Sequence, residues 1–156
     1  MELERAQAIA AALVKELQPF CEEIMVAGSI RRQRPLVKDI DLVIIPANQG
    51  QLAVKLHAMG CRFGGPKAQR LQYKGANVDI YIATVETFPM LVLVRTGSGA
   101  FNRDLAIRAK GQGLHFAADG RGILNKDGQR VAWLSEGEIL GTLGLPYIEP
   151  SRRERL

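Results

Sequence analysis

The sequence predicts an α+β fold, in which a mixed or antiparallel sheet with helices on one face is followed by a smaller α+β unit. Residues 2–17 space their apolar side chains as an amphipathic helix does, and residues 61–82 form short extended runs broken by glycine and proline. After Thr84, helical and short extended segments alternate. The length of 156 residues suits one domain or two small ones.

Local signals define the elements of the first unit. Pro19 ends the first helix, and the apolar run at residues 24–27 is typical of a strand that stops at a tight turn. A second strand is expected at residues 39–45, and residues 49–59 are expected to form a short helix. The last strand is expected at residues 77–83, where apolar and polar side chains alternate.

The second unit should begin with a helix at residues 86–94. A glycine-rich turn at residues 96–99 then precedes an amphipathic helix at residues 100–111, which we expect one of residues 99–102 to cap. A final helix is expected to open with the capping box S-E-G-E at residues 135–138. Short strands are expected between these two helices, at residues 115–116, 122–124 and 131–134.

Two aspartates in the first unit form a candidate metal site. Asp39 and Asp41 are two residues apart in an expected strand, so both carboxylates leave the same face. Adjacent carboxylates repel each other, and a divalent cation removes that cost. Mg²⁺ is the expected ion, because it takes carboxylate and phosphate oxygens together. The alternative is a solvated, charged strand edge.

The turn before these aspartates is a candidate anion site. Gly28 allows close approach of the backbone to a ligand, and Ser29 is expected to open the next segment like a helix N-cap, with free N–H groups. Basic side chains follow, and the planar fork of arginine suits phosphate oxygens. These basic residues are Arg31, Arg32, Arg34 and Lys38.

Charge and composition favour a polyanionic partner. The chain has 156 residues and a formal net charge of +5, with 47% hydrophobic and 24% charged residues, as in an ordinary soluble protein. No acidic residue lies between Asp41 and Asp79, so that interval should form a positive surface, or else a solvated basic face without a partner. Its basic residues are Lys55, Arg62, Lys67, Arg70 and Lys74.

The cysteines and the hydropathy of the chain bear on its cellular compartment and on membrane association. Cys21 and Cys61 have no C-x-x-C spacing, so they imply neither a zinc site nor a disulfide framework. A reducing, cytoplasmic compartment is expected. No apolar run approaches the roughly 18 residues of a membrane span, so no membrane association is expected.

Several motifs together resemble the family X DNA polymerases, the polymerase beta group of the nucleotidyltransferase superfamily. G-S-x-R-R followed by D-x-D resembles the signature of the family's palm, and R-T-G-S-G-A-F-N-R-D-L resembles its T-G-S motif with the following helix. The segments from G-L-H-F to G-I-L and L-G-L-P-Y-I-E-P-S-R-R-E resemble the thumb hairpin and the C-terminal tail. The resemblance covers essentially the whole chain and implies a palm at residues 1–86 and a thumb-like subdomain at residues 87–156.

The resemblance implies a DNA polymerase that acts in repair or gap filling. A primer 3′-hydroxyl would attack a deoxynucleoside triphosphate and release pyrophosphate, with two Mg²⁺ ions as cofactors and Mn²⁺ as a possible substitute. Asp39 and Asp41 would bind both ions, and Asp79 would be the third catalytic carboxylate, where the residues alone also allow a solvent-facing position. The expected partners are a DNA primer–template and deoxynucleoside triphosphates, and we expect a monomer.

The resemblance also implies binding residues outside the carboxylates. Ser29 and Arg32 would hold the beta and gamma phosphates, and Asn102 would read the minor-groove edge of the new base pair. The nucleotide-binding set is Gly28, Ser29, Arg32, Lys38, Thr96, Gly97, Ser98 and Asn102. The DNA-binding set is Lys67, Arg70, Arg103 and Arg108.

The sequence departs from the family pattern in two places. Val94 and Arg95 stand where the family often has an aromatic pair, which predicts weaker exclusion of ribonucleotides. The chain begins close to the palm, so neither lyase chemistry nor recognition of a downstream 5′-phosphate is expected. Three other functions stay open: modification of a small molecule or protein with a nucleotide, template-independent terminal transfer, and binding without catalysis.

Overall fold

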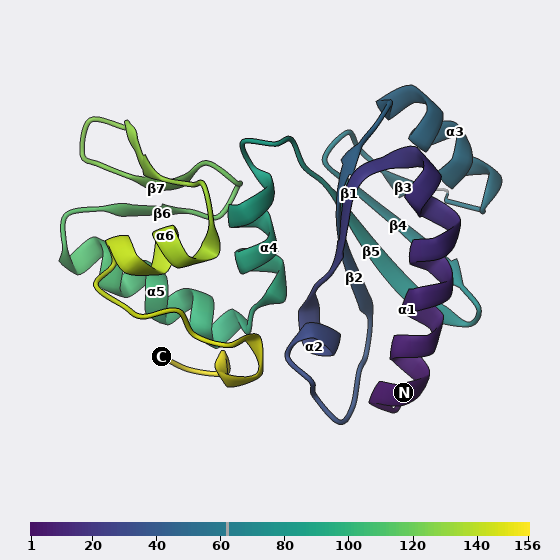
Figure 1. Cartoon of the computed structure of the whole chain (residues 1–156), viewed down its shortest axis with the longest axis horizontal. Helices are drawn as coiled ribbons and strands as arrows, with labels where there is room; N and C mark the ends of the chain where they lie inside the picture. Colours follow the sequence, from purple (N-terminus) through teal and green to yellow (C-terminus); the bar gives the residue numbers. More distant parts are fainter. Residues whose placement is uncertain (62) are drawn as a thin grey trace.

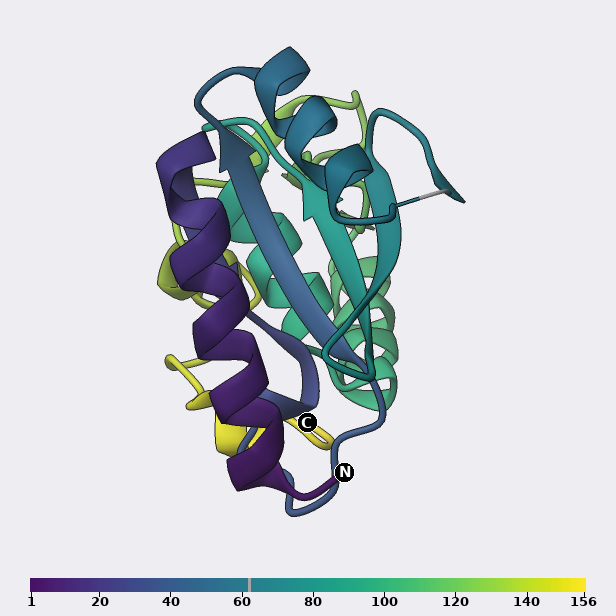
Figure 2. The ribbon, with the colours of Figure 1, turned by 90° about the vertical axis from the view of Figure 1, so that its right-hand side faces the viewer.

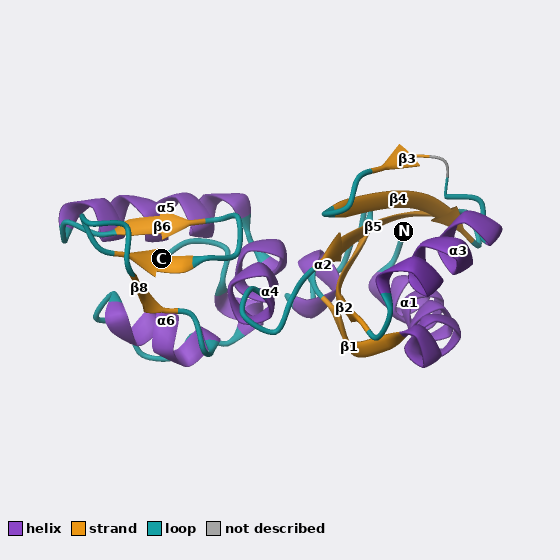
Figure 3. Cartoon of the chain, turned by 90° about the horizontal axis from the view of Figure 1, so that it is seen from above, coloured by secondary structure: helices purple, strands orange, loops and turns teal. Residues whose placement is uncertain are grey.

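The computed structural model describes residues 1–61 and 63–156, so Arg62 of the expected basic surface lies outside the described residues. The described residues form two lobes that meet at helix α4 (Phe88–Thr96) (Figures 1 and 3). We call residues 1–86 the first lobe and residues 87–156 the second lobe. This architecture confirms the predicted α+β fold, whereas the division into two domains stays a prediction.

The described part of the first lobe is built on a five-stranded mixed sheet in the order β1-β2-β5-β4-β3. Strands β2 and β5 are parallel, and the other neighbouring pairs are antiparallel. The strands are β1 (Cys21–Val26), β2 (Ile40–Pro46), β3 (Phe63–Gly64), β4 (Ala68–Tyr73) and β5 (Ala76–Ile82). The helices are α1 (Leu3–Leu17), the 3-10 turn η1 (Gln18–Phe20), α2 (Gly28–Arg31) and α3 (Gln49–Ala58).

Helices α1 and α3 cover one face of this sheet (Figure 2). The apolar stripe of α1 packs with Leu52 and Leu56 of α3 against the sheet, and Leu13 and Leu17 of α1 are fully buried. From the sheet, Ile40, Leu42, Ile44, Val78 and Ile80 contribute to the same core. The apolar periodicity of residues 2–17 thus correctly identified the side of α1 that packs on the sheet.

Helix α4 of the second lobe lies on the opposite face of the sheet, and its side chains are buried in the cores of both lobes. Leu91 and Val92 pack against Val43, Ile45 and other residues of the first lobe. Two further residues of α4, Met90 and Leu93, are buried in the core of the second lobe. Because one short helix contributes to two cores, the relative position of the lobes depends on its packing.

The second lobe has its own core around a three-stranded antiparallel sheet of described residues, in the order β6-β7-β8. Phe101 and Leu105 of α5 meet Ile139 and Leu140 of α6 there, and Ile123 of β7 is fully buried with them. The remaining elements are α5 (Gly99–Gly111), β6 (His115–Ala117), β7 (Gly122–Leu124), β8 (Arg130–Ala132), α6 (Glu136–Thr142) and the 3-10 turn η2 (Pro150–Arg152).

Two expected helix caps were assigned to the wrong residues. Helix α2 begins at Gly28 with Ala27 as its N-cap, so Ser29 lies inside the first turn and is not the cap. For α5 the cap is Ser98, one residue before the expected range, because its Oγ accepts a hydrogen bond from the N–H of Phe101 at 3.1 Å. In both cases glycine starts the helix, and the residue before it takes the extended cap conformation.

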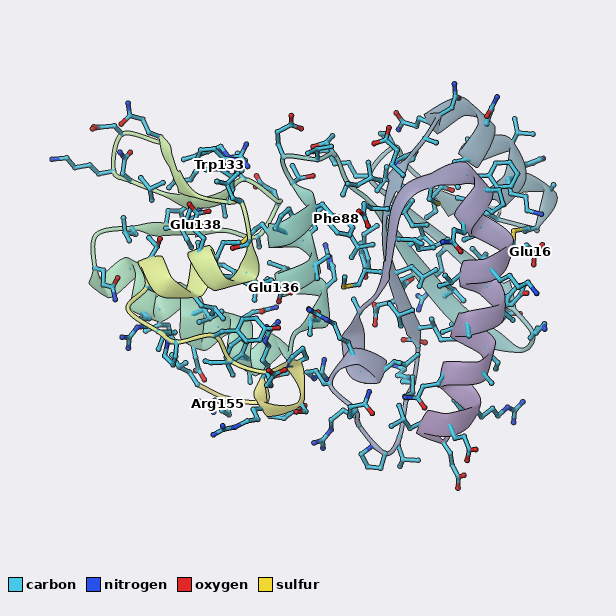
Figure 4. The ribbon with its side chains drawn as sticks, in the orientation of Figure 1. Glu16, Phe88, Trp133, Glu136, Glu138 and Arg155 are labelled. Atoms are coloured by element: carbon cyan, nitrogen blue, oxygen red, sulfur yellow. The ribbon has the colours of Figure 1, made fainter. Side chains whose placement is uncertain are left out.

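The capping box of α6 is half formed. Ser135 Oγ accepts a hydrogen bond from the N–H of Glu138 at 3.0 Å, as predicted. The Glu138 carboxylate, however, accepts from the N–H groups of Trp133 and Leu134, at 3.1 and 2.7 Å, and so fastens the preceding loop to the helix (Figure 4).

No helix within residues 1–61 and 63–156 is both long enough and apolar enough to cross a bilayer.

Two glycines of the second lobe offer a matched test of its packing. Both Gly122 and Gly128 have positive φ, of 95° and 78°. A Cβ on Gly122 would lie 2.0 Å from the carbonyl oxygen of Ala132, whereas a Cβ on Gly128 has no described atom within 4 Å. Gly128→Ala should cost about 1 kcal/mol of backbone strain, and Gly122→Ala should cost about 1 to 3 kcal/mol more from the clash. Urea unfolding of both variants measures this difference, and equal losses would contradict it.

Candidate active site

The pairing of β2 with β5 brings two of the predicted catalytic carboxylates together. Asp41 and Asp79 are directly opposite each other in the parallel register, and their side chains leave the face away from α1 and α3. Asp39 lies just before β2, on the same side of the chain as Asp41 by the alternation of strand residues. Carboxylates separated by 38 residues in sequence are therefore neighbours in space.

Arg70 bridges two of these carboxylates. It is opposite Asp79 in the antiparallel register of β4 with β5. Its Nε lies 3.1 Å from Oδ1 of Asp79, and one terminal nitrogen lies 3.6 Å from Oδ2 of Asp39. The side chain of Arg70 is 56% exposed, so each contact contributes about 1 kcal/mol or less. This predicted DNA-binding residue thus acts as a counter-ion for the carboxylates in this structure.

Asp41 has a different environment from its two neighbours. Burial raises the pKa of its carboxyl to about 6, with further contributions from the negative charges of Asp79 and Asp39. Arg95 and Arg32 act in the opposite direction and lower that pKa. The turn before α2 also packs closely on this carboxyl, because a Cβ on Gly28 would lie 2.0 Å from Asp41 Oδ2. Gly28, with its φ of 60°, is therefore required here for a structural reason.

The donor set of this cluster fits a divalent cation. Three carboxylates provide hard oxygen ligands of the kind that Mg²⁺ takes. The pKa of Asp41 is raised first by burial and next by the charges of Asp79 and Asp39, and a cation would neutralise those charges. As they stand, no three acidic, histidine or cysteine side chains in the described ranges converge on a common point. Arg70 bridges Asp39 and Asp79, so these two carboxylates point toward its guanidinium.

Arg95 is a feature of the site whose surroundings the sequence did not indicate. Its guanidinium lies 4.0 Å from the centre of the Tyr81 ring, a cation–π contact between α4 and β5. Tyr81 shares a face of β5 with Asp79, and this places the positive charge of Arg95 near the carboxylates. Arg95 is therefore stacked on Tyr81 in this structure, and the effect of Val94 and Arg95 on ribonucleotide exclusion stays a prediction.

The predicted phosphate-binding residues meet at the junction of the lobes. Arg32 donates from one terminal nitrogen to the carbonyl oxygen of Thr96, and its Nε donates to Glu154 at 2.9 Å. A Cβ on Gly97 would lie 3.0 Å from that terminal nitrogen of Arg32, which is closer than an ordinary van der Waals contact. The T-G-S turn therefore packs directly on Arg32, although the two are 64 residues apart along the chain.

The other predicted nucleotide-binding residues have mixed surroundings. Thr96 is buried, and its hydroxyl accepts a hydrogen bond from Arg31 at 2.9 Å. Ser29 is partly buried, and Lys38 is exposed on the loop before Asp39. The amide nitrogen of Asn102 donates to the carbonyl of Val94 at 2.8 Å, while its buried Oδ1 has no hydrogen-bond partner among the described residues. Such an orphan acceptor favours a ligand at Asn102.

The four predicted DNA-binding residues divide into two kinds. Lys67 and Arg103 are exposed, as Arg70 is, and could reach a backbone phosphate. Arg108 instead donates to the carbonyl of Leu143 at 2.6 Å and so satisfies the C-terminal end of α6. The DNA contact of Arg108 stays a prediction, but its position in this structure is explained by helix capping.

A cleft of about 840 Å³ adjoins the carboxylates. It is open between the β4–β5 side of the sheet and the turn that joins β6 to β7, and Tyr81 and Arg95 line it. Ala68 and Tyr81 form the next pair along this face of the sheet after Arg70 and Asp79. The cleft also receives Lys67 from the first lobe and Arg121 from the second, so both lobes contribute basic side chains.

A buried ion network fixes the lobes beside the site. Glu136 of α6 accepts hydrogen bonds from Arg31 of the first lobe, at 2.6 and 3.1 Å, and also binds Arg153. Arg153 is fully buried, so its charge depends on this partner. Figure 4 shows Glu136 on the side of the second lobe that faces the first. Neither Glu136 nor Arg153 was expected from sequence to take part in the site, because no local pattern distinguishes them from surface residues.

Known proteins resemble this chain in sequence and in structure. Residues 91–154 match the family model described as DNA polymerase beta thumb. The chain is 29% identical over 136 residues to DNA polymerase/3′-5′ exonuclease PolX of Bacillus subtilis (strain 168), a match that covers 82% of this chain and 24% of that protein. The chain therefore spans about a quarter of the length of this curated relative.

Two crystal structures of Leishmania infantum polymerase beta share the fold. The ternary P/T complex matches with a TM-score of 0.81 and 19% identity, and covers 99% of this chain and 76% of that one. The ternary gap complex matches with a TM-score of 0.81 and 18% identity, and covers 99% of this chain and 70% of that one. Both lobes, and not the second alone, are therefore similar to a polymerase beta structure.

The raised pKa of Asp41 predicts a pH-dependent stability change in metal-free protein. A carboxyl with a higher pKa in the folded state binds more protons there than in the unfolded chain, so stability falls as pH rises from about 4 to about 6. In EDTA, Asp41→Asn should raise the free energy of unfolding at pH 7 by about 1 to 3 kcal/mol and should have little effect below about pH 4.

Urea unfolding between pH 4 and pH 8 measures this effect, with Asp127→Asn in an exposed turn as the matched control. The control should follow wild type across the whole range. A stability difference between Asp41→Asn and wild type that does not vary with pH would show that burial of Asp41 does not impose the charge cost inferred from the structure.

Proposed function

We propose that the chain is a family X DNA polymerase, which transfers a deoxynucleotide from its triphosphate to a primer 3′-hydroxyl, in repair or gap filling. The observation that carries the proposal is the register of β2 with β5, which sets Asp41 opposite Asp79 with Asp39 beside them. This acidic face lies next to the T-G-S turn and Arg32, so groups that suit a metal and groups that suit a triphosphate adjoin each other.

The carboxylates would hold the metal ions of the reaction. Asp39 and Asp41 would bind both Mg²⁺ ions, or Mn²⁺ in their place, and Asp79 would bind one of them. When bound, the two ions would neutralise charge on the phosphates and favour ionisation of the 3′-hydroxyl. Asp79 would accept the hydroxyl proton once its contact with Arg70 has been released.

The triphosphate would lie against α2 and the T-G-S turn. Ser29 and Arg32 would bind its beta and gamma phosphates, with Lys38 near by, and the chain at Gly28 and Gly97 would approach it closely. Thr96 and Ser98 would shape the turn, and Asn102 would present its orphan Oδ1 to the nascent pair. Here the role of the protein is positioning and charge neutralisation, which are the main requirements of phosphoryl transfer.

The cleft beside the carboxylates is the proposed path for DNA. Lys67 lines it, Arg70 lies two residues along β4 from the lining residue Ala68, and Arg103 on α5 would contact the template backbone. We propose that the protein works as a monomer on primer–template DNA. From the spacing of its cysteines we also propose a reducing, cytoplasmic compartment.

Primer extension with a matched pair of variants tests the function. Asp79→Asn removes one proposed metal ligand, whereas Glu16→Gln changes a carboxylate on the opposite side of the same lobe, on α1, that also binds basic and phenolic side chains (Figure 4). Asp79→Asn should lower the rate at least about a hundredfold, because losing even an indirect metal contact costs 10- to 100-fold. Glu16→Gln should extend primers at the wild-type rate.

The assay should compare open, recessed and gapped templates with Mg²⁺ or Mn²⁺. Extension of templated primers supports the proposal, and addition without a template would identify a terminal transferase instead. If wild type extends no primer on any template with either metal, or if Asp79→Asn matches wild type, the proposed function is wrong.

A further inference from the structure

The last four residues form a strap across the T-G-S turn. We call residues 153–156 the C-terminal strap. The N–H of Ser98 donates to the carbonyl of Arg153 at 2.7 Å, and Ser98 Oγ donates to the carbonyl of Glu154 at 2.7 Å. Two main-chain carbonyls of the strap are therefore bound to a single residue of the turn, which holds the strap next to the proposed triphosphate site.

The end of the strap is fastened to α5 as well. Arg155 donates to both oxygens of Asp104, at 2.7 and 3.0 Å, and the N–H of Leu156 donates to the same carboxylate at 3.0 Å. These bonds lower the pKa of Asp104, first through the hydrogen bond from Arg155 and next through the N–H of Leu156. The label of Arg155 in Figure 4 marks where the strap passes below α5. The backbone of the strap is thus anchored on both sides of Glu154.

This anchoring places the Glu154 carboxylate on Arg32. Oε1 of Glu154 accepts from Arg32 Nε at 2.9 Å and lies 3.6 Å from Nε of Arg34. Arg32 is largely buried, with 15% of its side chain exposed, whereas Glu154 is 42% exposed. The other contact of Arg32, from its terminal nitrogen, is to the carbonyl of Thr96. The Glu154 carboxylate therefore binds the same guanidinium that, in the proposed function, binds the triphosphate.

We propose that Glu154 is a built-in competitor for the triphosphate, and that binding of a polyphosphate exchanges the partner of Arg32 from this carboxylate to a phosphate oxygen. The inference rests on the proposed function, which makes Arg32 the phosphate ligand. Carboxylate and phosphate oxygens accept the same kind of hydrogen bond from a guanidinium. The Nε of Arg32 can therefore donate to the Glu154 carboxylate or to a phosphate oxygen, but not to both at once.

The exchange requires movement of the Glu154 side chain only. Because the anchors of the strap are main-chain carbonyls and Asp104, the Glu154 side chain can turn into solvent while the backbone stays bound to Ser98. Its exposed position keeps the cost of release small. Glu154 therefore sets the affinity of the site for polyphosphates and does not close it.

Calorimetric binding of inorganic tripolyphosphate to the metal-free, full chain tests the exchange. Glu154→Gln keeps the size of the side chain and removes its charge, so it should bind tripolyphosphate about three- to tenfold more tightly than wild type. Glu149→Gln makes the same change at an exposed position five residues earlier, without a described contact of its side chain to Arg32, and should bind as wild type does. Glu154→Ala, which also removes the acceptor, should gain at least as much as Glu154→Gln.

Arg32→Ala separates this inference from the proposed function. In the Arg32→Ala background the gain from Glu154→Gln should disappear, because both anions lose their common partner. If Arg32→Ala weakens tripolyphosphate binding but neither Glu154 variant strengthens it, the competitor role is wrong and the proposed phosphate site stands. If Arg32→Ala binds as wild type does, or if no variant binds at all, both the phosphate role of Arg32 and the exchange are overturned.

Discussion

The parallel pairing of β2 with β5 is the constraint on which the rest of the structure depends. It sets Asp41 beside Asp79, and it is kept in register by the reverse face, where Leu42, Ile44 and Ile80 are completely buried under α1 and α3. A slip by one residue would turn the carboxylates into this apolar core. The hydrophobic core on one face of the sheet therefore positions the polar chemistry on the other.

Opposite charges within the protein pair with the charged groups of the proposed site. Arg70 lies on the carboxylates, and Glu154 lies on the arginine that we assign to the triphosphate. A cluster of three carboxylates beside an arginine-rich turn would otherwise carry unbalanced charge in a partly buried place. The exposed positions of Arg70 and Glu154 make both contacts weak enough to exchange.

A shared helix and a buried ion network join the two lobes, in addition to the contacts of Arg32 with Thr96 and Glu154. Helix α4 contributes side chains to both cores, and Glu136 joins Arg31 of the first lobe to Arg153 of the second. A buried arginine needs a paired carboxylate, so Glu136 is required for Arg153 to be tolerated in the interior. Arg31 also donates to the hydroxyl of Thr96, and Arg32 donates to the carbonyl of the same residue. The geometry of the network therefore also sets the shape of the proposed phosphate site.

By itself, the sequence determined the α+β fold, the buried apolar side of α1 and the identity of the motifs around Asp39, Asp41 and Asp79. These features follow from local periodicity and from residues a few positions apart, which one sequence displays directly. Ser29 and the start of α5 were misplaced as caps, because adjacent polar and glycine residues all satisfy a local capping pattern and tertiary packing selects one of them.

The tertiary structure alone decided which distant side chains meet. Arg70 on the carboxylates, Arg95 on Tyr81 and Glu154 on Arg32 are contacts between elements that are not adjacent in sequence. Their partners depend on strand order, register and lobe packing, none of which is encoded in the residues next to them. The sequence therefore identified the groups that could carry the chemistry, and the packing of the two lobes determined which of those groups are already engaged with each other.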